Sequence, residues 1–329
     1  MRFSLLISPA LPLLSLAHPS QMPRDTSSIP PYRGPAHNAV DSPCPIVNAF
    51  RNHGMIHSNG SFITKQAVMD AMGKLGIDSQ LQNLLASGAV MAGQYAREND
   101  KATIPWDNTP GFTKEGEWFN LNDLDFHDFV EHDASMSRED AALGNHVEFS
   151  PKVWSQVLDV FEGKEKTSID LIAKAMNVRY QDSKARNKDF KDEYRLKTAI
   201  LRYGEQAMWT QVLAKDVESG EVSVADMKLL FEKERFPDNF TAHPPNSITG
   251  TTVNTMVPEL FWANPGKGDE IRQIGIGNAM GFKDLLHNVN LKDFWHPHQL
   301  KEKVLGLYDE KKDGNVPIGD IPATDNDTR

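Results

Sequence analysis

Cys44 is the only cysteine in this chain of 329 residues, so the fold cannot depend on an internal disulfide bond. A free thiol is a liability in an oxidising compartment unless something binds it. A buried, inert side chain is the commonest role of a free cysteine in general. Because Cys44 stands between two prolines in a chain that reads as exported, we expect it to bind a metal instead.

The N-terminus has the features of a secretory signal peptide. Arg2 supplies a positive charge, residues 3–16 form an apolar run, and the small residue Ala17 marks a plausible cleavage site. We therefore predict a signal peptide over residues 1–17 and a secreted, extracellular protein. Three sequons for N-linked glycans fit this export route: Asn59, Asn239 and Asn326.

The rest of the chain divides by composition. Residues 18–40 are rich in proline and serine and predict a propeptide or an extended arm. Residues 41–320 read as a single globular domain, and residues 321–329 predict a flexible tail. The formal net charge of -10 argues against nucleic acid or an anionic membrane as a partner, because both would repel it. No protein partner is implied.

Apolar residues within the domain recur at the spacing of amphipathic helices, whereas strand-like alternation is scarce. Four segments show this spacing most clearly: residues 67–75, 81–85, 153–161 and 227–231. We therefore predict an all-α protein, with one mostly helical domain.

Pro45 is well placed as the first residue of a helix, because its missing N–H is no loss there. Cys44 would then lie at a helix N-terminus, where free backbone N–H groups and the helix dipole favour the thiolate over the thiol. One cysteine is too few for a structural zinc site, but one axial thiolate is enough for haem. A cysteine hydrolase would also need a positioned histidine base, and none of the 11 histidines stands out.

A second informative segment runs from Leu121 to Arg138. Its apolar residues predict a helix whose end carries Glu131, and Ser135 four residues later would face the same point. A carboxylate, a hydroxyl and a backbone carbonyl form an oxygen ligand set suited to Mg or Mn. On spacing alone, a solvated acidic face is the commoner outcome.

A third segment, residues 194–213, predicts one long helix with Glu205 on or near its apolar face. A carboxyl group buried there would have a raised pKa and could both accept and return a proton near neutral pH. Glu193 and Glu218 are weaker candidates. A glutamate in a helix is ordinarily solvated, so the pattern alone does not identify Glu205.

Three motifs, in this order, resemble the haem-thiolate peroxidase family, which includes chloroperoxidase and the unspecific peroxygenases of fungi. They are Pro-Cys-Pro at residues 43–45, Glu-His-Asp followed by Ser135 at residues 131–135, and Tyr-Gly-Glu at residues 203–205. Asn-His-Gly at residues 52–54 and Phe-Glu-Lys-Glu-Arg-Phe-Pro at residues 231–237 also match. The second motif is most similar to that of the short, histidine-containing peroxygenases. The resemblance spans about residues 41–245, lacks the Leu-Gly-Trp expected after Pro237, and is only scattered from Thr249 onward.

The resemblance implies a haem pocket enclosed by helices, with Cys44 as the proximal thiolate ligand of haem b. It implies that Glu131, the backbone carbonyl of His132 and Ser135 hold one divalent cation, Mg or Mn, against a haem propionate. Glu205 would be the distal acid-base residue, paired with the side chain of His132. The substrates would be hydrogen peroxide and a small organic molecule, which is oxidised or oxygenated through a ferryl intermediate.

Other functions remain open from the sequence. Within the same family, the chain could be a dedicated biosynthetic peroxidase for a secondary metabolite, or a haloperoxidase. A non-catalytic haem-binding protein is an alternative of a different class, in which Glu205 would have no task. A secreted acid hydrolase with paired carboxylates and no cofactor is another.

Overall fold

The computed structural model describes residues 29–105, 107 and 109–274. The predicted signal peptide, the predicted C-terminal tail, the Asn326 sequon and the first part of the predicted arm lie outside these residues. None of the helices in the described ranges is long and apolar enough to cross a membrane.

The described chain is mostly helical, which confirms the predicted all-α class. Its α-helices are α1 (Pro45–Asn52), α2 (Lys65–Lys74), α3 (Ser79–Glu98), α4 (Pro151–Val160), α5 (Ile169–Arg186), α6 (Phe190–Glu193), α7 (Leu196–Leu213), α8 (Val224–Lys233), α9 (Gly250–Ala263) and α10 (Lys267–Ile274). Two short 3-10 helices accompany them, η1 (Leu121–Asp125) and η2 (Ala141–Leu143). The strands β1 (Ile63–Thr64) and β2 (Trp118–Phe119) form one antiparallel pair, with Ile63 opposite Phe119.

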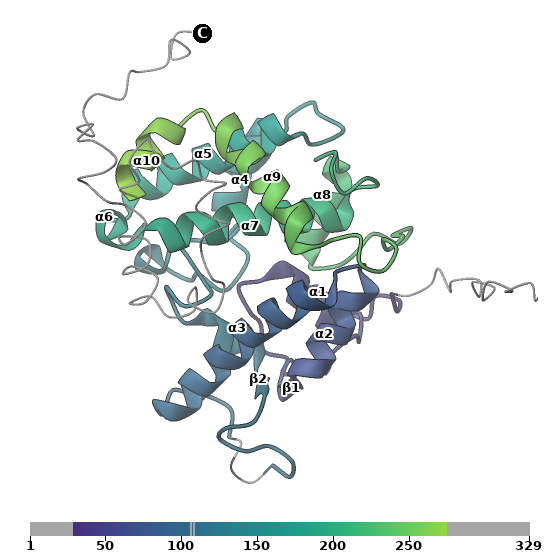
Figure 1. Ribbon diagram of the computed structural model, residues 1–329. Coiled ribbons are helices and arrows are strands. Elements are labelled where there is room, and N and C mark those ends of the chain that lie inside the picture. The colour runs from purple at the N-terminus through teal and green to yellow at the C-terminus, as the bar shows by residue number, and fades with distance from the viewer. Residues whose placement is uncertain (1–28, 106, 108, 275–329) are drawn as a thin grey trace, which may run out of the picture.

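The helices form two neighbouring parts of one domain (Figure 1). The first part contains α1, α2, α3 and the strand pair, and the second contains α4 to α10. In the second part, α7 packs against α9, and α5 packs against both α4 and α9. α1 contacts α8 and so joins the two parts, and one apolar core extends through both.

The four segments with helical spacing coincide with α2, α3, α4 and α8, except that Leu75 and Phe161 are the C-cap residues of α2 and α4. Each of these helices begins after a side chain that accepts a hydrogen bond from the backbone N–H three residues later: Thr64, Asp78, Ser150 and Ser223. The helix predicted over residues 194–213 is observed as α7, which begins at Leu196, because Tyr194 instead ends the short α6.

The described half of the predicted arm, residues 29–40, is attached to the first part of the domain. The backbone N–H of Arg33 donates to the carbonyl of Asn52 (2.9 Å), and that of Val40 donates to the carbonyl of Asn59 (2.9 Å). Contacts with the domain therefore begin before Asp41.

α9 and α10 lie where the family resemblance fades, yet they anchor α7. Glu270 of α10 is fully buried and accepts hydrogen bonds from the Tyr203 hydroxyl (2.8 Å) and the Asn264 amide (2.8 Å). It also pairs with Arg202 at 3.0 Å. Because Tyr203 and Arg202 stand just before Glu205 on α7, this cluster fixes the helix that carries the predicted acid-base residue.

Candidate active site

Cys44 is the N-cap residue of α1, and Pro45 opens the helix as predicted. The pKa of the Cys44 thiol is raised to about 11, chiefly because burial disfavours the thiolate. The backbone N–H groups of Val47 and Ile46 and the Arg138 guanidinium lower it. The helix N-terminus thus acts in the predicted direction, but the expectation that it favours the thiolate outright is wrong, because burial is the larger effect. A metal ion that binds Cys44 therefore has to displace the proton of the thiol.

A local hydrogen-bond network shapes the turn that presents Cys44. Asn48 accepts a bond from the backbone N–H of Ser42 (3.0 Å) and donates to the Ser42 carbonyl (2.8 Å). The Ser42 hydroxyl in turn accepts from the Cys44 N–H (3.2 Å). Glu234, at the C-terminus of α8, accepts from both Asn48 (2.8 Å) and Arg138 (2.7 Å). The cysteine turn is therefore tied to α8 and to the segment after Glu131.

The two supporting motifs also meet in this region. The backbone N–H of Phe236 donates to Nε2 of His53 (3.1 Å), and the two rings lie 5.4 Å apart between centroids. Asn52 donates to the Glu234 carbonyl (3.1 Å). These residues join the end of α1 to the end of α8.

Glu205 lies on the less buried face of α7, together with Leu201, Gly204 and Met208. Its side chain is 49% exposed, so the predicted burial of Glu205 is wrong. The physical reason is that this face of α7 is the one least covered by neighbouring helices; a Cβ built on Gly204 would meet no atom within 4 Å. The result is a mostly apolar, open strip that carries one carboxylate.

The structure brings the side chains of His132 and Glu205 together. Nε2 of His132 lies 3.0 Å from Oε2 of Glu205, and Nδ1 is hydrogen-bonded to the backbone oxygen of Asp133 (2.8 Å). Burial lowers the pKa of His132, but the charge and side chain of Glu205, the Asp133 carbonyl and Glu131 together raise it, to a net value of about 9. His132 is therefore an imidazolium at neutral pH; it is hydrogen-bonded to the Asp133 carbonyl on one side and forms an ion pair with Glu205 on the other.

Cys44 and Glu205 share one electrostatic environment. The charge of Glu205 raises the pKa of the Cys44 thiol, whereas Arg138 lowers it. Burial lowers the pKa of Arg138, and the charges of Glu234, Cys44 and Glu205 offset only part of this effect. The residues taken from three separate motifs thus face a common region between α1, α7 and the segment after η1.

The segment before Ser135 is not the helix that was predicted. Only η1 is helical, and the chain then takes positive φ angles at Asp128 (60°) and Ala134 (59°), which end helical geometry. Glu131 and Ser135 therefore do not share a helix face, and that interpretation is wrong. Glu131 is nonetheless buried, as a ligand to a cation beneath the surface would be.

His127 belongs to this site although the motifs did not single it out. Its Nδ1 binds Oε2 of Glu131 (2.7 Å), and its Nε2 lies 3.4 Å from Oε2 of Glu193. The hydrogen bond to Glu131 raises the pKa of His127 to about 9. His127, Asp133 and Glu193 place possible metal-ligating atoms within 4.8 Å of one another. As an imidazolium, His127 itself supplies the positive charge between the two glutamates.

Of the weaker candidates, only Glu193 lies near this cluster. Glu218 is exposed in the turn after α7, where its backbone N–H donates to Asp216 (3.0 Å). His127 stands four residues before Glu131, a spacing that predicts contact only within a helix. Because this segment is not helical, the spacing did not predict the contact between His127 and Glu131.

The chain matches one family model and is similar to two known proteins. A family model described as "Peroxidase, family 2" matches residues 30–244. The chain is similar to an aromatic peroxygenase from Cyclocybe aegerita, with 27% identity over 224 residues that cover 65% of this chain and 58% of that protein. It is also similar to a chloroperoxidase from Leptoxyphium fumago, with 26% identity over 238 residues that cover 68% of this chain and 59% of that protein. The match thus spans less than two thirds of the length of either relative.

Proposed function

This chain belongs to peroxidase family 2, and from that premise we propose that it is a haem-thiolate peroxidase or peroxygenase. It would use hydrogen peroxide to oxidise or oxygenate small organic molecules, in line with the names of the two relatives. The observation that carries the proposal is the approach of His132 to Glu205, at 3.0 Å, on the open face of α7.

The residues around Cys44 fit a haem group. Cys44 is the only thiolate donor in the chain, and it lies at a helix N-terminus whose N–H groups, together with Arg138, offset negative charge on sulfur. The partly open strip of Leu201, Gly204 and Met208 offers the small and apolar surface against which a porphyrin packs. Cys44 would be the proximal ligand. When bound, a thiolate-ligated haem supplies the redox chemistry that cleaves the O–O bond of peroxide.

Glu205 would serve as the acid-base residue. It would take a proton from one oxygen of hydrogen peroxide and return it to the other, so that O–O cleavage releases water rather than hydroxide. The His132 imidazolium, whose Nε2 lies 3.0 Å from Oε2 of Glu205, would orient the carboxylate. The exposure of Glu205 leaves room for peroxide and an organic substrate to reach it.

For a divalent cation, Mg or Mn, we propose Glu131, the backbone carbonyl of His132 and the hydroxyl of Ser135. All three offer oxygen atoms, which such cations prefer. Oε2 of Glu131 already accepts a bond from His127, and the Ser135 carbonyl accepts one from Arg179 (2.8 Å). The other carboxylate oxygen of Glu131, the His132 carbonyl and the Ser135 hydroxyl therefore remain for the cation, which would complete its coordination with water or an external anion.

Export and halide oxidation are secondary parts of the proposal. Asn239 is exposed in the turn after α8, as a glycan acceptor must be, whereas Asn59 is half-buried and its side chain accepts a bond from the Ser61 N–H (2.9 Å). We therefore expect a glycan at Asn239 in a secreted protein. The similarity to a chloroperoxidase makes halide the second candidate substrate.

Colour and peroxide dependence together test the function. A purified protein without a haem spectrum would point to the acid hydrolase. A haem protein that oxidises no member of a panel of phenols, alkenes and halides when peroxide is added would point to the non-catalytic haem-binding protein. Turnover that requires both haem and peroxide supports the proposal.

A further inference from the structure

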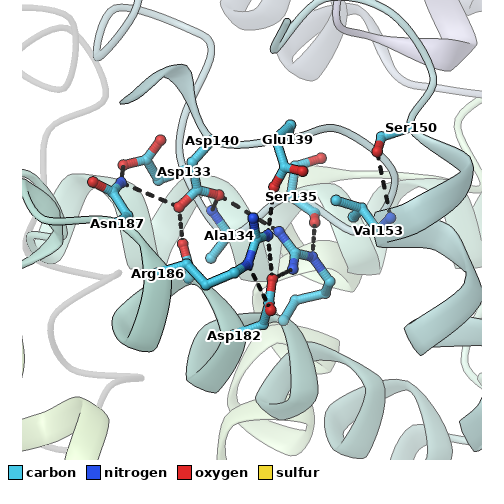
Figure 2. A network of polar contacts seen from close by, with 12 residues as sticks. Asp133, Ala134, Ser135, Glu139, Asp140, Ser150, Val153, Asp182, Arg186 and Asn187 are labelled. Carbon is cyan, nitrogen blue, oxygen red and sulfur yellow. Dashed lines mark hydrogen bonds and ion pairs between the residues drawn. The ribbon is translucent and has the colours of Figure 1, made fainter. Parts of the chain in front are cut away.

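A buried polar cluster holds the segment after His132 against the C-terminal half of α5 (Figure 2). We call it the Asp140 cluster, and its members are Asp133, Asp140, Arg179, Ser183 and Asn187. Asp140, Arg179 and Ser183 are each 0% exposed. α5 contributes no residue to the proposed catalytic or cation-binding groups, so those groups do not explain why this polar cluster is buried here.

Asp140 is the centre of the cluster. Its Oδ1 accepts a hydrogen bond from the backbone N–H of Ala134 (3.1 Å) and lies 3.5 Å from Nη2 of Arg179. Its Oδ2 accepts from the Ser183 hydroxyl and from Nδ2 of Asn187 (3.1 Å). Both carboxylate oxygens are thus bonded on one side to α5, and one of them also reaches the backbone of the catalytic segment.

The residues on either side of Ala134 are held by α5 and by its C-cap residue, Asn187. Nε of Arg179 donates to the carbonyl of Ser135 (2.8 Å), and Nδ2 of Asn187 donates to the carboxylate of Asp133 (2.6 Å). Three consecutive residues after His132 are therefore bound to α5, or to Asp140, which α5 holds. Figure 2 shows these contacts converging on the segment from the helix.

Ala134 shows that the segment needs this support. Its φ of 59° lies in the left-handed region, which costs a non-glycine residue roughly 1 kcal/mol. Such a conformation persists only where the surroundings determine it, and here hydrogen bonds reach both the N–H of Ala134 and the carbonyl of Ser135. A buried ion pair is a poor source of stability, because desolvation offsets its attraction. The pair of Asp140 and Arg179 is better explained by the geometry it imposes.

We infer that Asp140 and Arg179 are positioning residues, which fix the backbone from His132 to Ser135. They would thereby aim the His132 ring at Glu205 and the His132 carbonyl and Ser135 hydroxyl at the cation. This inference rests on the proposed function. Whether the Asp140 cluster holds the backbone in place can be measured without turnover.

The test compares Asp140→Asn and Arg179→Lys with Arg186→Gln in the haem-loaded protein. Arg186 belongs to the same network, where it pairs with Asp182 and Glu139, but it contacts none of the residues from His132 to Ser135. Loss of an outer residue that orients metal ligands typically costs about 10- to 100-fold in affinity. We expect a loss of that size in Mg or Mn affinity for the first two variants and less than about 3-fold for Arg186→Gln.

A second readout separates positioning from general stability. Amide hydrogen exchange at residues 131–136 should speed up in Asp140→Asn and Arg179→Lys, while exchange in α2 and α3 stays unchanged. If Asp140→Asn does not fold, Arg179→Lys, which keeps the charge but loses the Nε donor, carries the test. Folded variants with wild-type exchange and cation affinity would overturn the inference. If the wild-type protein binds no cation and does not react with peroxide, the proposed function fails. The hydrogen-exchange result still decides whether the Asp140 cluster fixes the backbone from His132 to Ser135.

Discussion

Nε2 of His132 lies 3.0 Å from Oε2 of Glu205, although one residue stands in an irregular segment and the other in the middle of α7. The histidine is buried and hydrogen-bonded on its other side, whereas half of the Glu205 side chain is exposed. The His132 imidazolium is therefore held in one orientation, and the Glu205 carboxylate is the solvent-exposed member of the pair. This asymmetry is the reason that we propose proton transfer for Glu205 and an orienting role for His132.

Glu205→Gln keeps the size of the side chain but removes its ability to accept a proton. The rate at which the ferric protein consumes peroxide in stopped-flow mixing should fall roughly 10²- to 10⁴-fold. Haem content should not change. Glu218→Gln, on the exposed turn after α7, is the control and should react like the wild type. A wild-type rate in fully loaded Glu205→Gln would mean that another carboxylate transfers the proton.

His132→Ala should slow the same reaction less than Glu205→Gln does, because Glu205 remains able to transfer a proton. Stopped-flow mixing with peroxide, with both variants fully loaded with haem, compares the two rates. A loss as large as that of Glu205→Gln would indicate that His132 itself transfers the proton.

Glu131→Gln should lose the bound Mg or Mn, because a neutral amide is a poorer ligand for a hard divalent ion. The exposed Glu148, in the loop before α4, provides the matched variant Glu148→Gln, which should keep the cation. Elemental analysis of both purified proteins gives the comparison. One equivalent of cation in Glu131→Gln would place the site elsewhere.

His127→Gln should change how stability depends on pH. The folded-state pKa of His127, about 9, lies above its ordinary value of 6.5. Its protonation therefore stabilises the fold fully below pH 6.5, and this contribution is lost as the pH rises through about 9. His132 titrates in the same window, with a pKa of about 9.

Urea unfolding at about pH 6 and about pH 9.5 measures this effect, and each histidine contributes at most roughly 3 kcal/mol between these values. His127→Gln should remove about half of the fall in unfolding free energy. The same change at exposed His57 should leave the fall as it is. If the unfolding free energy of His127→Gln falls as much between these pH values as that of the wild type, the imidazolium between Glu131 and Glu193 contributes no stability.

Local features of the sequence predicted local structure well. Pro45 places the start of α1 and leaves Cys44 at its N-cap, because proline has a strong positional preference that needs no tertiary contact. The apolar spacing of α2, α3, α4 and α8 predicted these helices for the same reason. The role of Glu205 came from the family resemblance, since no local pattern links a helix to the segment around His132.

The failed expectations depend on tertiary structure. The helix predicted up to Glu131 ends at Asp125, and the chain then takes a positive φ at Asp128 without the glycine that usually signals it. Glu205 is not buried as expected, because which face of α7 is buried depends on the neighbouring helices. Asp140 and Arg179 form a contact between separate elements, so a single sequence gave no indication of them.

The most direct test of the central claim is the absorption spectrum of the reduced protein with carbon monoxide, for the wild type and Cys44→Ala. We expect the strongly red-shifted Soret band of a thiolate ligand in the wild type. We expect the loss of that band, and of most haem-loaded protein, in the variant, because haem stabilises the folded state by binding to it. Since Cys44 is the only cysteine, a thiolate-type band that persists in Cys44→Ala, or is missing from a haem-loaded wild type, would show that Cys44 is not the haem ligand.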